Sequence, residues 1–215
     1  MIEVEVHGTQ WVLHPDRAVF WPSQEMLIVT DLHLGKIQHF RNAGIYLPPY
    51  AAYDNYERLS GLLLEFSPKT LLILGDLFHS NLNQDWKNFC ELRDSFSHIH
   101  FELVPGNHDI LDDNLFLKNN ILLHQERAIF ETLSFSHYPE KNSNAHYYNV
   151  AGHLHPGIRL VGDGLQSLRL PIFYLGANHA LLPSFGTFTG TSLIEVQPGD
   201  QVIAITKDTL VPIEN

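Results

Sequence analysis

The sequence predicts an α/β fold in which two β-sheets pack against each other and helices flank them. Three apolar runs without polar alternation, at residues 26–30, 70–74 and 99–104, are typical of strands buried on both faces of a sheet. Helical segments separate these runs, so the order of strand, helix and strand predicts right-handed crossovers within one sheet. After residue 121, short strands and glycine-rich turns predict a second sheet.

The elements expected along the chain begin with short strands. Apolar and acidic residues alternate over residues 2–6, as in a strand with one buried face, and further strands are expected at 11–13 and 18–21. The two predicted helices cover residues 48–66, which begin with two prolines, and residues 83–96. The predicted strands of the second sheet cover residues 128–135, 147–151, 168–175, 191–196 and 201–206.

Length and composition predict one well-filled domain spanning residues 1–215. The chain is 44% hydrophobic and 17% charged, and it contains no linker, repeat or low-complexity tract. With 13 Lys and Arg against 24 Asp and Glu, the net charge is −11. This charge argues against nucleic-acid binding through a broad basic surface, because such binding needs clustered cations that displace counterions.

The single cysteine and the N-terminal residues predict a cytoplasmic location. Cys90 cannot form an internal disulfide and lies in a helical stretch, which suits a reducing compartment. Residues 1–6 carry acids where a signal peptide carries bases, and no apolar run approaches the roughly 18 residues of a membrane span. We therefore expect no association with membranes.

Metal-ligand residue types follow the apolar runs, at the ends of the predicted strands. The chain has 14 histidines, and imidazole is the commonest metal ligand in proteins. In open α/β sheets, ligands bind in the crevice at strand ends, and alternate residues of an extended segment point to one side. One such group is more often an ordinary turn, but five in succession favour a shared site. The candidates are Asp31, His33, Asp76, Asn107, His108, Asp109, His137, His153 and His155.

These residues form five motifs, which are Asp-x-His at 31–33, Gly-Asp at 75–76, Gly-Asn-His-Asp at 106–109, His137, and Gly-His-x-His at 152–155. In this order they resemble the motifs of the calcineurin-like metallophosphoesterase superfamily. The resemblance implies a four-layer α/β/β/α sandwich of two mixed β-sheets flanked by helices. It also implies two divalent metal ions in a cleft between the sheets.

Further segments narrow the resemblance to one bacterial branch. Residues 31–36, 75–80, 152–156 and 182–190 are similar to the ligase-associated DNA damage response endonucleases of the PdeM branch. The Asp-Arg pair that follows the second motif in protein Ser/Thr phosphatases is missing from the sequence. Asp109 also replaces their glutamate, which argues against a phosphoprotein substrate.

The resemblance assigns the metal ligands by position. One ion would be held by Asp31, His33, Asp76 and His155, and the other by Asp76, Asn107, His137 and His153. Carboxylate, imidazole and amide ligands without thiolate suit Mn²⁺, with Fe or Zn²⁺ as alternatives. Two divalent ions, two aspartates and a bridging hydroxide leave a local charge of about +1, so the centre attracts phosphate although the chain is negative.

The resemblance also implies hydrolysis of a phosphodiester by attack of the metal-bridging hydroxide. His108 would protonate the leaving alkoxide, and Asp109 would hold the His108 imidazole in the required tautomer. Lys36 and Arg41 flank the first motif and could contact phosphate oxygens, although solvated charges on a helix are an equal alternative. His79 could orient a metal ligand or, alternatively, cap a turn.

We therefore expect a dinuclear metal-dependent phosphodiesterase, and the resemblance points to a DNA endonuclease linked to DNA repair. The net charge favours a small or single-stranded substrate over long duplex, so the candidate substrate is single-stranded or nicked DNA. The resemblance implies a repair ligase and a helicase as partners. A small-molecule phosphodiesterase or nucleotide pyrophosphatase with the same centre is an alternative. A second alternative is a non-catalytic, metal-stabilised partner of a repair ligase or helicase, against which the His108–Asp109 pair argues.

Overall fold

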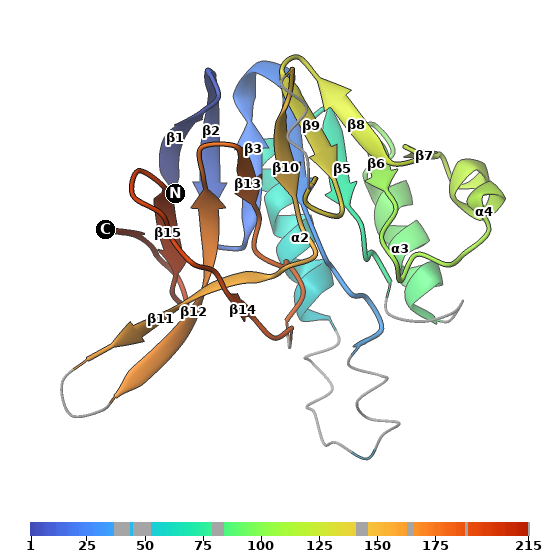
Figure 1. The fold of residues 1–215 in the computed structure, drawn as a ribbon. Coiled ribbons are helices and arrows are strands. Elements are labelled where there is room, and N and C mark those ends of the chain that lie inside the picture. Colours follow the sequence, from blue (N-terminus) through green and yellow to red (C-terminus); the bar gives the residue numbers. More distant parts are fainter. Residues whose placement is uncertain are drawn as a thin grey trace.

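Two mixed β-sheets face each other, and helices cover the outer face of the first sheet (Figure 1). No helix in the described part of the chain is long and apolar enough to cross a membrane. The computed structural model describes residues 1–36, 44, 53–78, 84–140, 146–162, 166–187 and 189–214.

The first sheet changes from antiparallel to parallel pairing at its fourth strand. β1 to β4 pair antiparallel in chain order, whereas β4 to β7 pair parallel. The parallel strands therefore end at one edge of the sheet, where α/β proteins bind ligands. Across the sheet the strands are β1 (Ile2–Val6), β2 (Thr9–His14), β3 (Ala18–Trp21), β4 (Met26–Val29), β5 (Thr70–Leu74), β6 (His100–Val104) and β7 (Ile121–Leu123).

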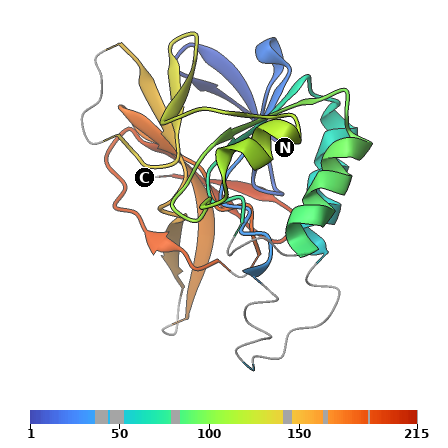
Figure 2. The same cartoon turned by 90° about the vertical axis from the view of Figure 1, so that its right-hand side faces the viewer.

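The described helices pack on the outer face of this sheet. They are α2 (Asp54–Phe66), α3 (Gln84–Ser95) and α4 (Asp113–Lys118). Asp54 and Glu57 lie in the first turn of α2, where carboxylates interact favourably with the helix dipole. Leu63 and Phe89 are buried against the strands in one apolar cluster. The turned view shows α2 and α3 along one side of the molecule and the second sheet along the other (Figure 2). A short 3-10 helix, η1 (Pro22–Gln24), precedes β4.

The second sheet is also mixed. β9, β10 and β13 pair in parallel, and antiparallel pairs join β8 to β9 and β11 to β12. β12 pairs with β13 and β15, β15 pairs with β16, and β14 pairs with β11. The strands are β8 (Arg127–Phe130), β9 (Leu133–Ser136), β10 (Tyr148–Ala151), β11 (Pro156–Val161), β12 (Ser167–Leu175), β13 (His179–Leu181), β14 (Ser192–Leu193), β15 (Gln201–Ile205) and β16 (Leu210–Ile213).

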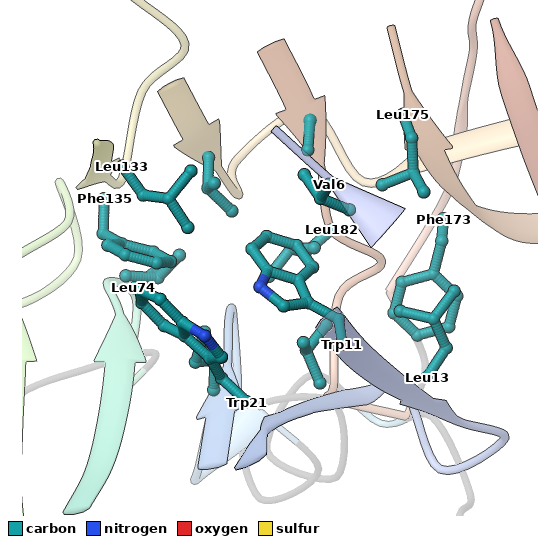
Figure 3. Packing of buried hydrophobic residues seen from close by; sticks show 14 of the residues in the cluster. Val6, Trp11, Leu13, Trp21, Leu74, Leu133, Phe135, Phe173, Leu175 and Leu182 are labelled. Atoms are coloured by element: carbon teal, nitrogen blue, oxygen red, sulfur yellow. The ribbon is translucent and has the colours of Figure 1, made fainter. Parts of the chain in front are cut away.

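The main core lies between the two sheets (Figure 3). Trp11 and Trp21 reach into it from the first sheet, and Phe135 meets them from the second. In β5, Leu74 packs in this core, whereas the preceding Ile73 packs beneath the helices. Both faces of the strand are therefore buried, which explains an apolar run without alternation. Each fully buried side chain of this kind stabilises the fold by about 1.5–3 kcal/mol.

The predicted fold class of two packed, mixed sheets flanked by helices is confirmed, although several boundaries differ. Residues 128–135, predicted as one strand, form the hairpin β8–β9, because the chain turns at Glu131, whose φ is 53°. The predicted strand at 191–196 shortens to β14. β7, β11, β13, β16 and α4 have no counterpart in the prediction, because such short runs carry little periodic signal.

The outer face of the second sheet is covered by an irregular segment. Ile172, Tyr174 and Val202 on this face pack with Ile194 and Val196, which follow β14. Among the residues that the structure describes, the helices lie on the first sheet, and this segment stands where the four-layer arrangement has helices.

Candidate metal centre

The candidate metal ligands converge where the two sheets meet. β4 leads to Asp31 and His33, and its parallel neighbour β5 leads to Asp76. β9 and β10, also parallel neighbours, lead to His137 and His153. The backbone N–H of His153 donates to Asp31 Oδ2 at 2.9 Å, so a hydrogen bond joins the two sheets here. The site therefore depends on how the sheets pack as well as on each strand.

Five of the candidate ligands adopt a left-handed backbone conformation. Their φ angles are 52° for Asp31, 47° for His33, 48° for Asp76, 64° for His153 and 47° for His155. Non-glycine residues rarely adopt positive φ, and those that do cluster at functional sites. The chain thus turns tightly at these ligands, whereas spacing alone suggests extended segments. Asp31 and His33 still meet at one point, but His153 and His155 join different groups.

Two glycines allow the strand ends to approach closely. An added β-carbon at Gly152 would lie 1.8 Å from Thr30 Oγ1, and one at Gly75 would lie 2.3 Å from His137 Nδ1. Gly75 also has a φ of 75°, which side chains disfavour. Both distances are far below van der Waals contact, so any larger residue would displace the side chains that form the site.

The first group of ligating atoms belongs to Asp31, His33 and His155, which lie within 4.8 Å of one another. Asp31 is fully buried, and its Oδ1 lies 3.3 Å from His155 Nε2. Burial alone would raise the pKa of Asp31, but contact with His155 and a 2.6 Å hydrogen bond from Thr30 Oγ1 hold it below its usual value. Asp31 is therefore an anion at neutral pH, which suits a cation among these three side chains.

The second group comprises Asp76, His137 and His153, again with ligating atoms within 4.8 Å of one another. His137 Nδ1 donates to the carbonyl oxygen of Leu74 at 3.0 Å, so the lone pair lies on Nε2. That nitrogen faces His153 Nδ1 at 3.1 Å, Asn107 Oδ1 at 3.4 Å and Asp76 Oδ1 at 3.6 Å. Ligands about 2.1 Å from one ion lie about 3.0–3.4 Å apart, so the first two separations fit a shared cation and the third is slightly longer.

Asp76 lies between the two groups. Its Oδ1 lies 3.6 Å from His137 Nε2, and its Oδ2 lies 3.9 Å from His33 Nε2. Oδ1 also accepts a 3.0 Å hydrogen bond from the backbone N–H of His108, which orients the carboxylate. The chain thus offers two adjacent donor sets around one carboxylate, and their oxygen and imidazole donors fit two divalent ions.

His108 lies beside the candidate ligands and is open to solvent. Its side chain is 39% exposed, and its Nε2 lies 4.0 Å from Asp76 Oδ2. The centres of the His108 and His33 rings are 5.7 Å apart, in an edge-on arrangement. A substrate that binds between the two donor groups can therefore reach this imidazole.

Asp109 has different partners from those that the sequence suggests. Its Oδ1 accepts hydrogen bonds from the backbone N–H groups of Leu77 at 2.9 Å and Phe78 at 3.3 Å. Its Oδ2 accepts one from Gly106 at 2.9 Å. Burial raises the pKa of Asp109 to about 6, although these three N–H groups favour the carboxylate. In the described residues, Asp109 therefore ties the loop after β6 to the loop after β5 and does not hold the His108 imidazole.

We expect the Asp109→Ala substitution to lower the free energy of unfolding by about 2–4 kcal/mol, because three partly buried N–H groups lose their acceptor. Urea denaturation measures this loss. Asp113→Ala, at an exposed position in α4, is the matched control and should change stability by less than about 0.5 kcal/mol. Unchanged stability of Asp109→Ala with an altered pH–rate profile would instead support contact with His108.

Tyr138 and Thr30 belong to the site although the sequence does not single them out. The Tyr138 hydroxyl donates to Asn107 Oδ1 at 2.9 Å, and the Tyr138 and His153 ring centres are 4.4 Å apart. Thr30 Oγ1 donates to Asp31 Oδ2 at 2.6 Å. Both residues hold a candidate ligand in place. Neither residue belongs to a metal-ligand motif, so only the fold shows that each lies beside a candidate ligand.

Of the three predicted substrate contacts, Lys36 lies in the described part of the chain. Burial lowers the pKa of its half-buried ammonium group, while the negative charges of Asp31 and Asp76 act against this shift. The ammonium group therefore lies within electrostatic reach of both donor groups. Arg41 and His79 lie outside the described residues.

The stability of the metal-free protein should fall as the pH is lowered. Burial lowers the pKa of His33 to about 3, and the charge of Lys36 acts in the same direction. Below about pH 6.5 the unfolded chain protonates this histidine while the folded protein does not. The unfolded state thus binds more protons, so acidification favours unfolding. Between about pH 6.5 and pH 4.5 we expect the protonation of His33 in the unfolded chain to lower the free energy of unfolding of chelator-treated protein by up to about 2–3 kcal/mol.

Urea denaturation at both pH values tests this prediction. The His33→Asn variant should show a shallower pH dependence than the wild type. The matched control, His98→Asn, changes an exposed residue in the turn before β6 and should keep the wild-type slope. Equal slopes for all three proteins would contradict the prediction.

Comparison with known proteins places this geometry in a family. A family model described as calcineurin-like phosphoesterase matches residues 26–201. The crystal structure of Pseudomonas putida nuclease MPE matches with a TM-score of 0.82 and 27% sequence identity, covering 99% of each chain. A protein of unknown function from Aquifex aeolicus, AQ665, is 20% identical over 65% of this chain and 82% of its own, with a TM-score of 0.42. No curated protein matches the sequence.

The family match covers both donor groups and the strands that position them. Two adjacent sets of carboxylate and imidazole donors are what a dinuclear phosphoesterase centre requires. The protein is therefore a metal-dependent phosphoesterase, and the chain belongs to the calcineurin-like phosphoesterase family.

Proposed function

We propose that this phosphoesterase is an endonuclease that hydrolyses phosphodiester bonds in DNA. The observation that carries the proposal is the likeness to a nuclease over 99% of both chains at 27% identity. A likeness of this extent includes every strand that leads to the candidate ligands. A role in DNA repair, with a ligase and a helicase as partners, rests on the resemblance of the motifs to the PdeM branch.

In this proposal the two donor groups hold two divalent ions, with Asp76 shared between them. The donors contain no thiolate, which suits Mn²⁺. Such ions supply an activated water molecule and offset the charge that develops on the phosphate. The ligand sets are Asp31, His33, Asp76 and His155 for one ion and Asp76, Asn107, His137 and His153 for the other.

The other residues of the site act on the substrate and on the ligands. The His108 side chain is partly exposed beside Asp76, where its imidazole can donate a proton to the leaving oxygen. The Lys36 ammonium group, within electrostatic reach of Asp76, can attract the phosphate. Asp109 and Tyr138 are positioning residues: the first orders the loop that carries His108, and the second orients the Asn107 amide.

A small-molecule phosphodiesterase or nucleotide pyrophosphatase is the second candidate function. The observation that favours it is the net charge of −11, which repels a long polyanion and slows its encounter with the protein. Salt weakens this repulsion, so the two candidates differ most at low ionic strength.

Hydrolysis assays with Mn²⁺-loaded protein separate the two functions. The substrates are a labelled single-stranded oligonucleotide, plasmid DNA, a cyclic nucleotide and bis(p-nitrophenyl) phosphate. Nicking of plasmid DNA that is abolished by Asp76→Asn would support the nuclease. If the protein hydrolyses the small diesters but leaves both DNA substrates intact, the nuclease proposal is wrong and the second candidate replaces it.

A further inference from the structure

A pocket of about 390 Å³ adjoins the candidate metal centre on the side of the second sheet. His155, which belongs to the first donor group, lines it together with Arg17 and Arg169. Thr189 and Thr191 also line it, and among the described residues that line it none is Asp or Glu. In a chain with 24 acidic and 13 basic residues, this lining has the opposite charge to the molecule as a whole.

The arginines around this pocket differ from the other described arginines in their partners. Arg58, Arg93 and Arg127 each form an ion pair with a carboxylate. In the described part of the chain, no carboxylate oxygen lies within 4.0 Å of the guanidinium nitrogens of Arg17, Arg159 or Arg169. Arg17 and Arg169 line the pocket beside His155, and Arg159 is the strand partner of Arg169. Cations without a paired carboxylate at this place in an acidic protein favour an anionic ligand there.

Arg159 and Arg169 face each other across the β11–β12 hairpin. They are direct partners in the register of the two strands, and both are exposed. Like charges in this arrangement lower the stability of a hairpin. The hairpin projects from the body of the molecule (Figure 1), so neither residue is needed to fill the core. The pair therefore lowers the stability of the hairpin, although Arg159 Nη2 also donates a hydrogen bond across it to Ser167 Oγ at 3.1 Å.

The hairpin places this arginine pair on the pocket side. Side chains two residues apart on a strand share a face, and Arg169 and Pro171 both line the pocket. Arg159, opposite Arg169, extends the same face along the hairpin. On the other side of the pocket, one terminal nitrogen of Arg17 donates to the carbonyl oxygens of Ser184 and Gly186, each at 3.1 Å, which fixes its guanidinium group.

We propose that this pocket and the adjoining face of the hairpin bind the phosphate groups of single-stranded DNA next to the scissile phosphate. The inference rests on the proposed nuclease function and deepens it. With the scissile phosphate at the donor groups, the strand would pass His155 into the pocket, where Arg17 and Arg169 bind one phosphate, and Arg159 would bind the next. Guanidinium groups bind phosphate oxygens in bidentate fashion, and local positive charge attracts the strand although the chain is acidic. A small diester has only one phosphate and cannot use these contacts.

Binding measurements test the inference without turnover. Fluorescence anisotropy of fluorescein-labelled oligothymidylate, in EDTA and at several NaCl concentrations, reports the contribution of the side chains alone. We expect the Arg159→Gln/Arg169→Gln double variant to bind the oligonucleotide about tenfold more weakly than the wild type. The slope of log K against log salt should become shallower by about 1.4, because each of two lost phosphate contacts contributes about 0.7. The matched control is Lys69→Gln, which removes one positive charge at the N-terminal end of β5, away from the site, and should bind as the wild type does. Wild-type affinity and salt slope in the double variant would overturn the inference.

Kinetic and thermal measurements separate a binding role from a structural one. The double variant should lose about tenfold in kcat/KM for an oligonucleotide but keep its rate on bis(p-nitrophenyl) phosphate, and its Tm should not fall, because like charges are removed. Arg169→Lys should bind DNA with intermediate affinity, since it keeps the charge and loses the bidentate geometry. Equal losses on both substrates would overturn the inference. If the double variant loses DNA binding but the wild-type protein cleaves no DNA, the proposed nuclease function is wrong, whereas the inferred DNA-binding site is still supported.

Discussion

The Asp76→Asn variant is expected to hydrolyse phosphodiesters about 10³-fold more slowly than the wild type, or slower still. Asp76 faces both donor groups, with Oδ1 3.6 Å from His137 Nε2 and Oδ2 3.9 Å from His33 Nε2. Loss of its charge should therefore weaken the binding of both ions at once. A divalent ion contributes several kcal/mol to such a reaction, and each 1.36 kcal/mol is a factor of ten in rate.

Metal content and rate together test this prediction. Elemental analysis of protein purified without chelator should find two ions in the wild type and fewer in Asp76→Asn. The matched control is Asp208→Asn, an exposed aspartate in the turn between β15 and β16, which should keep both ions and full activity. An Asp76→Asn variant with two bound ions and the wild-type rate would remove this carboxylate from the metal centre.

The His108→Asn variant should lose about 10²–10⁴-fold in rate on an oligonucleotide and much less on bis(p-nitrophenyl) phosphate. An alkoxide leaving group needs a proton as the bond breaks, whereas nitrophenolate is stable without one. The proposed role assigns this proton to His108, whose side chain is 39% exposed and whose Nε2 lies 4.0 Å from Asp76 Oδ2. The ratio of the two rates therefore reports proton donation separately from the other contributions of the site.

Metal analysis distinguishes His108 from a ligand. The His108→Asn variant should retain both ions, in contrast to Asp76→Asn. His98→Asn, at an exposed position before β6 and so at the opposite end of that strand from His108, serves as the matched control and should hydrolyse both substrates at the wild-type rate. Equal losses on the two substrates would show that His108 does not act as the acid.

The strands that lead to the site could be predicted because a strand buried on both faces appears in the sequence as a short run of apolar residues. β4 and β5 are apolar without alternation, since the second sheet covers one face and the helices cover the other. β6 differs from this prediction, because its exposed His100 and half-buried Glu102 alternate with buried apolar residues. The motif residues directly follow these strands, so their meeting at one edge follows from parallel pairing. The hairpin β8–β9 was harder to predict, because a two-residue turn leaves the apolar run almost unbroken.

The roles of individual side chains could be predicted less well, because they depend on contacts between distant segments. Asp109 follows His108 directly, which suggests that it orients the imidazole, yet its carboxylate accepts N–H groups from the loop after β5. Tyr138 and Arg169 belong to no motif. Tyr138 contacts the site through the hydrogen bond from its hydroxyl to Asn107, and Arg169 is placed by the pairing of β11 with β12.

By itself, the sequence determined which residue types stand at the strand ends, and with them the family and the metal-based chemistry. Only the tertiary structure shows that the ligating atoms of six side chains gather in two groups of three, with Asp76 facing both groups, and which neighbours orient them. The physical reason is that the burial of a strand and the composition of a turn depend on residues that are consecutive in the sequence. The spacing of the two donor groups is instead set by sheet packing, by left-handed turns at five candidate ligands, and by a hydrogen bond between Asp31 and His153, 122 positions apart.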